Sequence, residues 1–192
     1  MLQLVSRGAR AGLAAVRPAA TVKARASLQG AVFGITGLAG RLRDMLSWCR
    51  ITALHIQNAD IKPADMKHLV GVLGECGSLA HLDFADSYLG DEGAGRLARV
   101  LDRCGSLTHL ILSFCRIGDT GARKLAGALG KGACPSLAHL DLSYNEIHPE
   151  EGENLRDCGT RAEIVLDYQI LDDIDADEFH LDDFDYLPYG PD

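Results

Sequence analysis

Three histidines recur at matching places in the middle of the chain and could act as metal ligands. His81, His109 and His139 are separated by 28 and 30 residues, and Asp83 and Asp141 follow two of them at the same offset. Imidazole and carboxylate groups both bind zinc, so the spacing permits a metal site. Side chains on neighbouring parallel strands, however, point the same way about 4.8 Å apart and do not converge on one ion. We therefore expect no metal and interpret the histidines as a solvated or partner-contacting column.

Four of the six cysteines also follow a regular spacing. Cys76, Cys104, Cys134 and Cys158 are separated by 28, 30 and 24 residues, a pattern that matches neither a zinc motif nor a C-x-x-C redox pair. Such cysteines are typical of buried free thiols, and these indicate a reducing intracellular compartment.

Other motifs for catalysis or ion binding fail. Asp173, Asp175 and Asp177 resemble the start of a calcium loop, but Glu178 stands where the turn needs glycine and Phe184 where the bidentate glutamate belongs. The sequence has no P-loop, G-x-G-x-x-G, H-E-x-x-H or G-x-S-x-G motif. We expect a protein without enzymatic activity, cofactor or small-molecule substrate.

The spacing of these residues comes from an internal repeat. Four segments open with the apolar pattern L-x-x-L-x-L-x-x-N/C-x-L, the signature of a leucine-rich repeat. The pattern residues are Ile51, Leu54, Ile56 and Ile61; Leu79, Leu82, Phe84 and Leu89; Leu107, Leu110, Leu112 and Ile117; and Leu137, Leu140, Leu142 and Ile147. The ninth position holds Ala59, Ser87, Cys115 or Asn145, which suit a tight turn.

After each apolar pattern the period changes from about 2 to about 3.6, which indicates a strand followed by a helix. Asp91 and Asp119 precede two of these helices, where a carboxylate favours the helix N-terminus. The helices are expected to end at Gly77, Gly105 and Pro135.

The repeats resemble the ribonuclease-inhibitor-like class of leucine-rich repeats, with units of 28 residues. The resemblance implies an α/β solenoid, a horseshoe segment with parallel strands on the concave face and helices on the convex face. We divide the chain into a basic N-terminal extension (1–27), an N-terminal cap or degraded repeat (28–50), four repeats (51–78, 79–106, 107–136 and 137–160) and a partial repeat with a C-terminal cap and acidic tail (161–192).

The concave face is where partners of such solenoids usually bind, so its exposed positions are the candidate site. These positions are His55, Gln57, His81, Asp83, Asp86, His109, Ile111, Phe114, His139, Asp141 and Tyr144. They contain no Lys or Arg, which disfavours nucleic acid, and no segment is apolar enough for an integral membrane protein. The predicted function is a scaffold, adaptor or assembly subunit that binds another protein.

Two alternatives are kept. The repeat class and the acidic C-terminal stretch are similar to GTPase-activating proteins of the Ran activator type, which would place the activating residue at Arg116. Alternatively, these repeats are a fragment of a larger leucine-rich-repeat receptor or axonemal regulator.

The two ends differ sharply in charge. Residues 1–43 carry seven Lys and Arg residues without an acid, and the arrangement over 1–28 favours an amphipathic helix typical of a mitochondrial or other organellar transit peptide; otherwise the protein would be cytoplasmic. Residues 162–192 carry eleven acids without a Lys or Arg. Aromatic side chains lie among these acids, so the tail is expected either to cap the last repeat or to dock on a partner.

Overall fold

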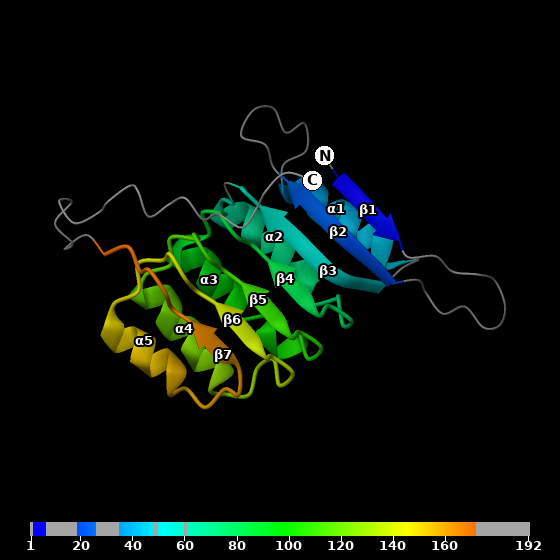
Figure 1. Cartoon of the computed structure of the whole chain (residues 1–192). Helices are drawn as coiled ribbons and strands as arrows, with labels where there is room; N and C mark the ends of the chain where they lie inside the picture. The colour runs from blue at the N-terminus through cyan, green and yellow to red at the C-terminus, as the bar shows by residue number, and fades with distance from the viewer. Residues whose placement is uncertain (1, 7–18, 26–34, 48–49, 60, 172–192) are drawn as a thin grey trace.

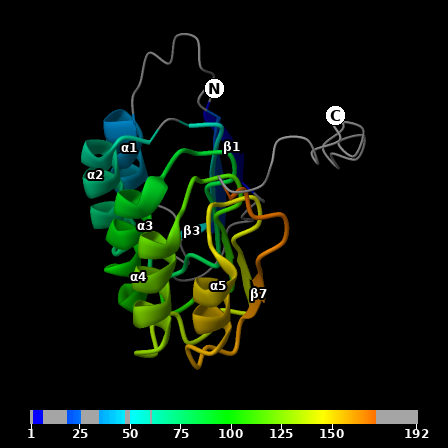
Figure 2. The ribbon, with the colours of Figure 1, turned by 90° about the vertical axis from the view of Figure 1, so that its left-hand side faces the viewer.

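The protein is built from two layers, a single sheet and a row of helices packed on one of its sides (Figure 1, Figure 2). The computed structural model describes residues 2–6, 19–25, 35–47, 50–59 and 61–171. Within them, strand and helix alternate along the chain from β3 onward. The fold is the α/β solenoid expected from the repeats, with an open sheet of little curl.

Seven strands form the sheet in chain order. They are β1 (Leu2–Ser6), β2 (Ala19–Arg25), β3 (Arg50–Gln57), β4 (His81–Asp83), β5 (His109–Ile111), β6 (His139–Asp141) and β7 (Glu163–Val165). β1 and β2 are antiparallel, whereas β2 to β7 are all parallel. Parallel neighbours require a crossover between them, and the helices supply it.

The helices lie side by side along the other layer. They are α1 (Ile35–Leu46), α2 (Pro63–Leu73), α3 (Gly90–Ala98), the short 3₁₀ helix η1 (Leu101–Arg103), α4 (Asp119–Leu129) and α5 (Pro149–Arg156). α2 and α5 begin at proline, whose fixed φ suits the first helical position. α2, α3 and α4 end before Gly77, Gly105 and Pro135, so these residues lie in the turns that lead to the next strand.

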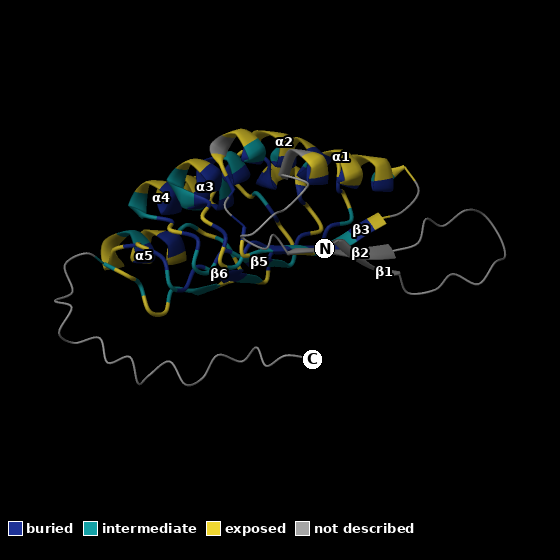
Figure 3. Cartoon of the chain, turned by 90° about the horizontal axis from the view of Figure 1, so that it is seen from above, coloured by how far each residue is buried: buried dark blue, intermediate teal, exposed yellow. Residues whose placement is uncertain are grey.

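The core lies between the layers and is formed by the apolar pattern residues. The leucines at the centre of four successive strands, Leu54, Leu82, Leu110 and Leu140, are all completely buried. Burying one such side chain contributes roughly 1.5–3 kcal/mol. Figure 3 shows the buried sides of the helices turned toward the sheet and their exposed sides turned away. Successive side chains along each strand point to opposite sides of the sheet. The side chains between the buried ones therefore lie on the side that none of the described helices covers.

The N-terminal part of the chain differs from the expectation for residues 1–28. Residues 2–6 and 19–25 are strands rather than an amphipathic helix, and β2 pairs with the edge of β3 through Val22↔Leu54. An uncovered sheet edge offers a row of unpaired backbone groups, and the β-branched Thr21 and Val22 suit a strand there. The transit-peptide interpretation remains a prediction.

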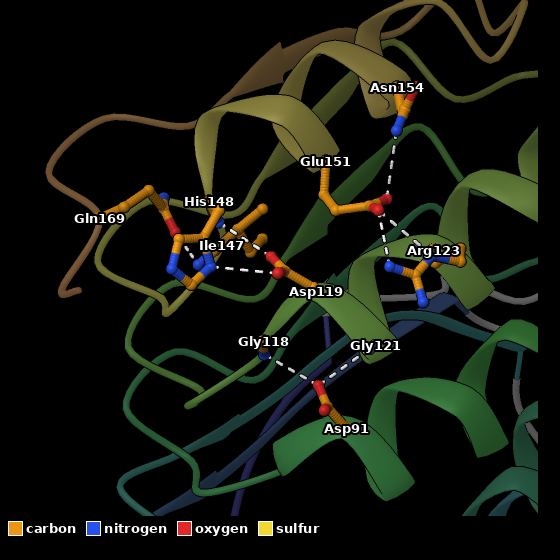
Figure 4. Close-up of polar contacts among 10 residues, drawn as sticks. All are labelled: Asp91, Gly118, Asp119, Gly121, Arg123, Ile147, His148, Glu151, Asn154 and Gln169. Carbon is orange, nitrogen blue, oxygen red and sulfur yellow. Dashed lines mark hydrogen bonds and ion pairs between the residues drawn. The ribbon is translucent and has the colours of Figure 1, made fainter. Parts of the chain in front are cut away.

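Aspartates link each repeat to the next one (Figure 4). Asp91 Oδ1 accepts hydrogen bonds from the backbone N–H groups of Gly118 (2.8 Å) and Gly121 (2.9 Å), at the start of α4. Asp119 Oδ1 likewise accepts from the backbone N–H of His148 (2.9 Å). A Cβ atom at Gly121 would lie 2.7 Å from Asp91 Oδ1, so the contact needs glycine there. The expected carboxylates are present, but their hydrogen bonds go to the following repeat.

Candidate functional site

The candidate site is the side of the sheet without helices, together with the turns that follow the strands; we call it the sheet face. Strand pairing arranges its side chains in columns. One column is Ala53, His81, His109, His139 and Glu163, and the next is His55, Asp83, Ile111, Asp141 and Val165. Gln57 is the last residue of β3, and Asp86, Phe114 and Tyr144 follow their strands. The structure thus brings the predicted residues together on one side of the sheet. The expectation that all of them are exposed is wrong for Asp83, which is buried beside His55 and Gln57.

The three histidines of the first column lie ring against ring. The rings of His81 and His109 are stacked with centroids 4.5 Å apart, and those of His109 and His139 are 5.9 Å apart and tilted by 41°. His139 Nδ1 lies 3.4 Å from a carboxylate oxygen of Glu163. No group of three or more metal-ligand side chains arranged for an ion occurs within the described residues. Burial, and then the proximity of His109 and His55, lower the pKa of His81 and favour its neutral form.

Asp83 is the centre of a polar network at the N-terminal half of the sheet face. Its buried carboxylate accepts from Gln57 Nε2 (2.6 Å) and the backbone N–H of Ala85 (2.9 Å), and lies 3.0 Å from His55 Nδ1. Burial by itself would raise the pKa of Asp83, but these hydrogen bonds outweigh it and lower the pKa. The carboxylate of Asp83 is therefore satisfied by contacts within the chain.

An aromatic stack occupies the C-terminal half. The rings of Phe114 and Tyr144 are 4.2 Å apart and 9° from parallel, and those of Tyr144 and Tyr168 are 5.0 Å apart and 14° from parallel. We call these three residues the aromatic ladder. Burial raises the pKa of Tyr144, and Tyr168, Asp167 and Asp141 add to the effect. The phenol therefore lies in a negative environment.

The ladder residues share a left-handed backbone conformation. In each turn after β3 to β7, the residue at one equivalent position has φ between 53° and 56°, and we call these positions rungs; Arg116, two residues after Phe114, also has φ 53°. The rungs are Asn58 and Asp86, which are polar, and Phe114, Tyr144 and Tyr168, which are aromatic. Asn and Asp adopt this conformation readily, whereas it is unusual for a bulky residue. Aromatic residues at three rungs in succession carry backbone strain that the fold does not require.

Sequence analysis missed Tyr168 because the fifth apolar pattern arrives after only 24 residues, a spacing that predicts no full helix before it, although the structure places α5 there. The signal was present nonetheless. Tyr168 follows Leu166 by two residues, as Tyr144 follows Leu142.

At three rungs, the polar side chain of the next residue, Ser87, Asn145 or Gln169, holds the turn in place. Asn145 is completely buried; its Oδ1 accepts from the backbone N–H groups of Cys115 and Ile117, both at 3.0 Å. Its Nδ2 donates to the carbonyls of Leu112 (2.8 Å) and Leu142 (2.9 Å). Ser87 makes a smaller set of contacts at the equivalent position, and Gln169 supplies an amide side chain after Tyr168.

The predicted cysteine column lies beside the core. Cys76, Cys104 and Cys134 are buried and form no disulfide, whereas Cys158 is half-buried. Burial raises the pKa of Cys104 to about 11 and that of Cys134 to about 12, which keeps both as thiols at neutral pH.

Arg116, the residue that a GTPase activator would use, has an aromatic neighbour. Its guanidinium carbon lies 4.5 Å from the ring centroid of Tyr88, and the side chain is exposed. The acidic Asp173, Asp175 and Asp177 lie outside the described residues.

Comparisons with known proteins agree with this architecture. The leucine-rich repeat family model matches residues 103–126 and 133–153. Among solved structures, the chain is similar to one described as leiomodin-1 actin-binding site 2, with a TM-score of 0.54 and 14% identity over 70% of this chain and 78% of that chain. At this identity the likeness concerns the fold alone. No curated protein matches the sequence. No described helix has the length and apolar character needed to cross a membrane. Residues 103–126 and 133–153 thus match leucine-rich repeats, and the fold of the chain is that of a leucine-rich-repeat solenoid.

Proposed function

We propose that the protein is a non-enzymatic interaction module, a scaffold, adaptor or assembly subunit, that binds another protein through its sheet face. The observation that carries this proposal is the aromatic ladder. Three partly exposed rings occupy backbone positions that suit Asn or Asp better. Strained residues cluster at functional sites, and aromatic side chains dominate the binding energy of many interfaces.

The other features of the face agree with a binding role. The ladder adjoins Ile111 and Val165, which are half-buried and apolar, and the histidine column lies beside them. The helix side, by contrast, exposes mainly charged side chains on α3 and α4. An apolar centre with a polar surround is the usual anatomy of a protein interface.

The test is affinity capture with the intact chain and with the double variant Phe114→Asp, Tyr144→Asp. Asp86 has φ 56° at its own rung, so aspartate fits the backbone and the variant is expected to fold. The matched control is Thr120→Asp, Ser136→Asp, which adds the same charge at exposed residues of α4 and the turn before β6.

We expect the control to keep every partner and the ladder variant to lose them. If the partners survive the ladder variant while circular dichroism shows both variants folded, the sheet face is not the binding surface. Because the similar structure carries an actin-binding site in its description, purified actin is included as one candidate partner.

A further inference from the structure

The aromatic ladder lies in a negatively charged part of the sheet face. Among the described residues from β4 to the turn after β7, the acids on this face are Asp83, Asp86, Asp141, Glu146, Glu163 and Asp167. Asp83 contacts His55 and Gln57, Asp141 accepts from Ser143, and Glu163 lies near His139. Asp86, Glu146 and Asp167 make no side-chain hydrogen bond or ion pair to another described residue. The single cation there, Arg116, already lies over Tyr88. The face therefore has excess negative charge that its own side chains do not balance.

The rings also offer surface for a cation. Stacking inside the ladder uses both faces of Tyr144 but only one face of each end ring. Tyr168 is 72% exposed and follows Asp167 directly, while Phe114 is the rung next to Asp86. Each end of the ladder thus combines an aromatic ring with a carboxylate that has no partner.

We propose that the ladder binds an extended, arginine-containing segment of the partner protein. This inference rests on the proposed function and adds the partner's chemistry. A guanidinium group stacks on an aromatic ring and pairs with a carboxylate at the same time, whereas a lysine ammonium does so less well. Arg116 on Tyr88 shows the same contact within the chain. Asp86 and Asp167 would pair with the arginines, and Phe114 and Tyr168 would support their planes.

The experiment measures binding of the full chain to three labelled twelve-residue peptides by fluorescence anisotropy. The peptides alternate glycine with arginine, lysine or glutamate. We expect the arginine peptide to bind about three- to tenfold more tightly than the lysine peptide, and the glutamate peptide not to bind. Binding should weaken as salt is raised from 50 to 500 mM, since exposed charges are screened.

Two variants separate charge from stacking. The double variant Asp86→Asn, Asp167→Asn should weaken the arginine peptide about tenfold, an effect of two charge-assisted contacts. The matched control, Glu150→Gln with Glu153→Gln on α5, changes the net charge equally and should leave binding unchanged. The double variant Phe114→Asn, Tyr168→Asn, with asparagine suited to both rungs, removes the two rings that would support the guanidinium planes and should abolish the preference for arginine over lysine.

Equal binding of arginine and lysine peptides, binding of the glutamate peptide, or no binding of the arginine peptide would each overturn the proposal. These results are distinct from failure of the proposed function. If partners captured by the intact chain are lost from the Phe114→Asp, Tyr144→Asp variant but no arginine preference exists, the sheet face binds a partner of other chemistry. If they are retained by that variant, both proposals fail.

Discussion

The polar rungs and the aromatic rungs share one backbone conformation, yet their surroundings are opposite. At the N-terminal half, Asn58 and Asp86 suit φ near 55°, and the neighbouring Asp83 is paired within the chain. At the C-terminal half, aromatic residues adopt the same φ less readily, and the nearby Glu146 and Asp167 make no side-chain hydrogen bond or ion pair to another described residue. The difference teaches that the repeat determines where a rung lies, but not which residue occupies it. A residue unsuited to its backbone position points to selection for something other than folding.

The largest effect should come from the residue that supports the strained turns. Asn145→Ala removes five hydrogen bonds and leaves buried backbone groups of Cys115 and Ile117 without a partner. We expect a loss of about 3–4 kcal/mol in the free energy of unfolding, measured by urea denaturation.

The comparison is Ser87→Ala, which removes the smaller contacts with Ile56 and Ala59 after a polar rung. It should lose only about 1–2 kcal/mol. Equal losses would show that both halves depend on their turns to the same extent.

The next effect tests whether the polar half is held by its own network. Asp83→Ala removes the acceptor shared by His55, Gln57 and the Ala85 backbone. Because the side chains of His55 and Gln57 can reach water, we expect a loss of about 2 kcal/mol in urea denaturation. The Asp83→Ala variant should bind the arginine peptide at the aromatic ladder as the parent does. If it binds the peptide more weakly, the two halves of the sheet face form a single binding site.

A smaller change should follow when an aromatic rung is made polar. Tyr144→Asn relieves the strained backbone but loses stacking with Phe114 and Tyr168. These terms are similar in size, so the unfolding free energy should stay within about 1 kcal/mol of the parent. A loss of unfolding free energy well above about 1 kcal/mol would show that the aromatic ladder stabilises the fold. The contrast between polar rungs that suit the fold and aromatic rungs that do not would then be wrong.

The smallest effect concerns pH. The pKa of His81 is lowered below 6.5, so the unfolded chain binds its proton more readily than the folded chain. The stability from neutral His81 is therefore complete above pH 6.5 and decreases as the pH falls through the folded pKa. Asp83, whose pKa is lowered below 3.8, contributes stability above pH 3.8 that is lost at still lower pH.

Thermal unfolding measured across this range should show a modest decrease of Tm below pH 6.5, which His81→Gln reduces. The same decrease in the variant would mean that other groups cause it.

The sequence predicted the sheet and most of the site because burial follows a period. Leu54, Leu82 and Leu110 occupy the same place in successive units, and a strand-to-helix change of period identifies the fold. The positive φ of Phe114 could not be predicted from this periodicity, because bulky residues rarely adopt a left-handed backbone conformation. The hydrogen bonds of Asp91 were also beyond local patterns, because their partners belong to another unit.

The hydrogen bonds of Asp91 also limit how repeats of this kind can be duplicated. Since Asp91 caps the helix of the next unit and Gly121 leaves space for it, a unit cut at its own boundaries would carry a cap for a neighbour and lack one for itself. Duplication preserves the pairing only if adjoining copies keep aspartate on one side and glycine on the other. The unit that must be copied intact is therefore the boundary between two repeats, with the aspartate of one and the glycine of the next. Designed arrays would need to keep this pair at every boundary between repeats.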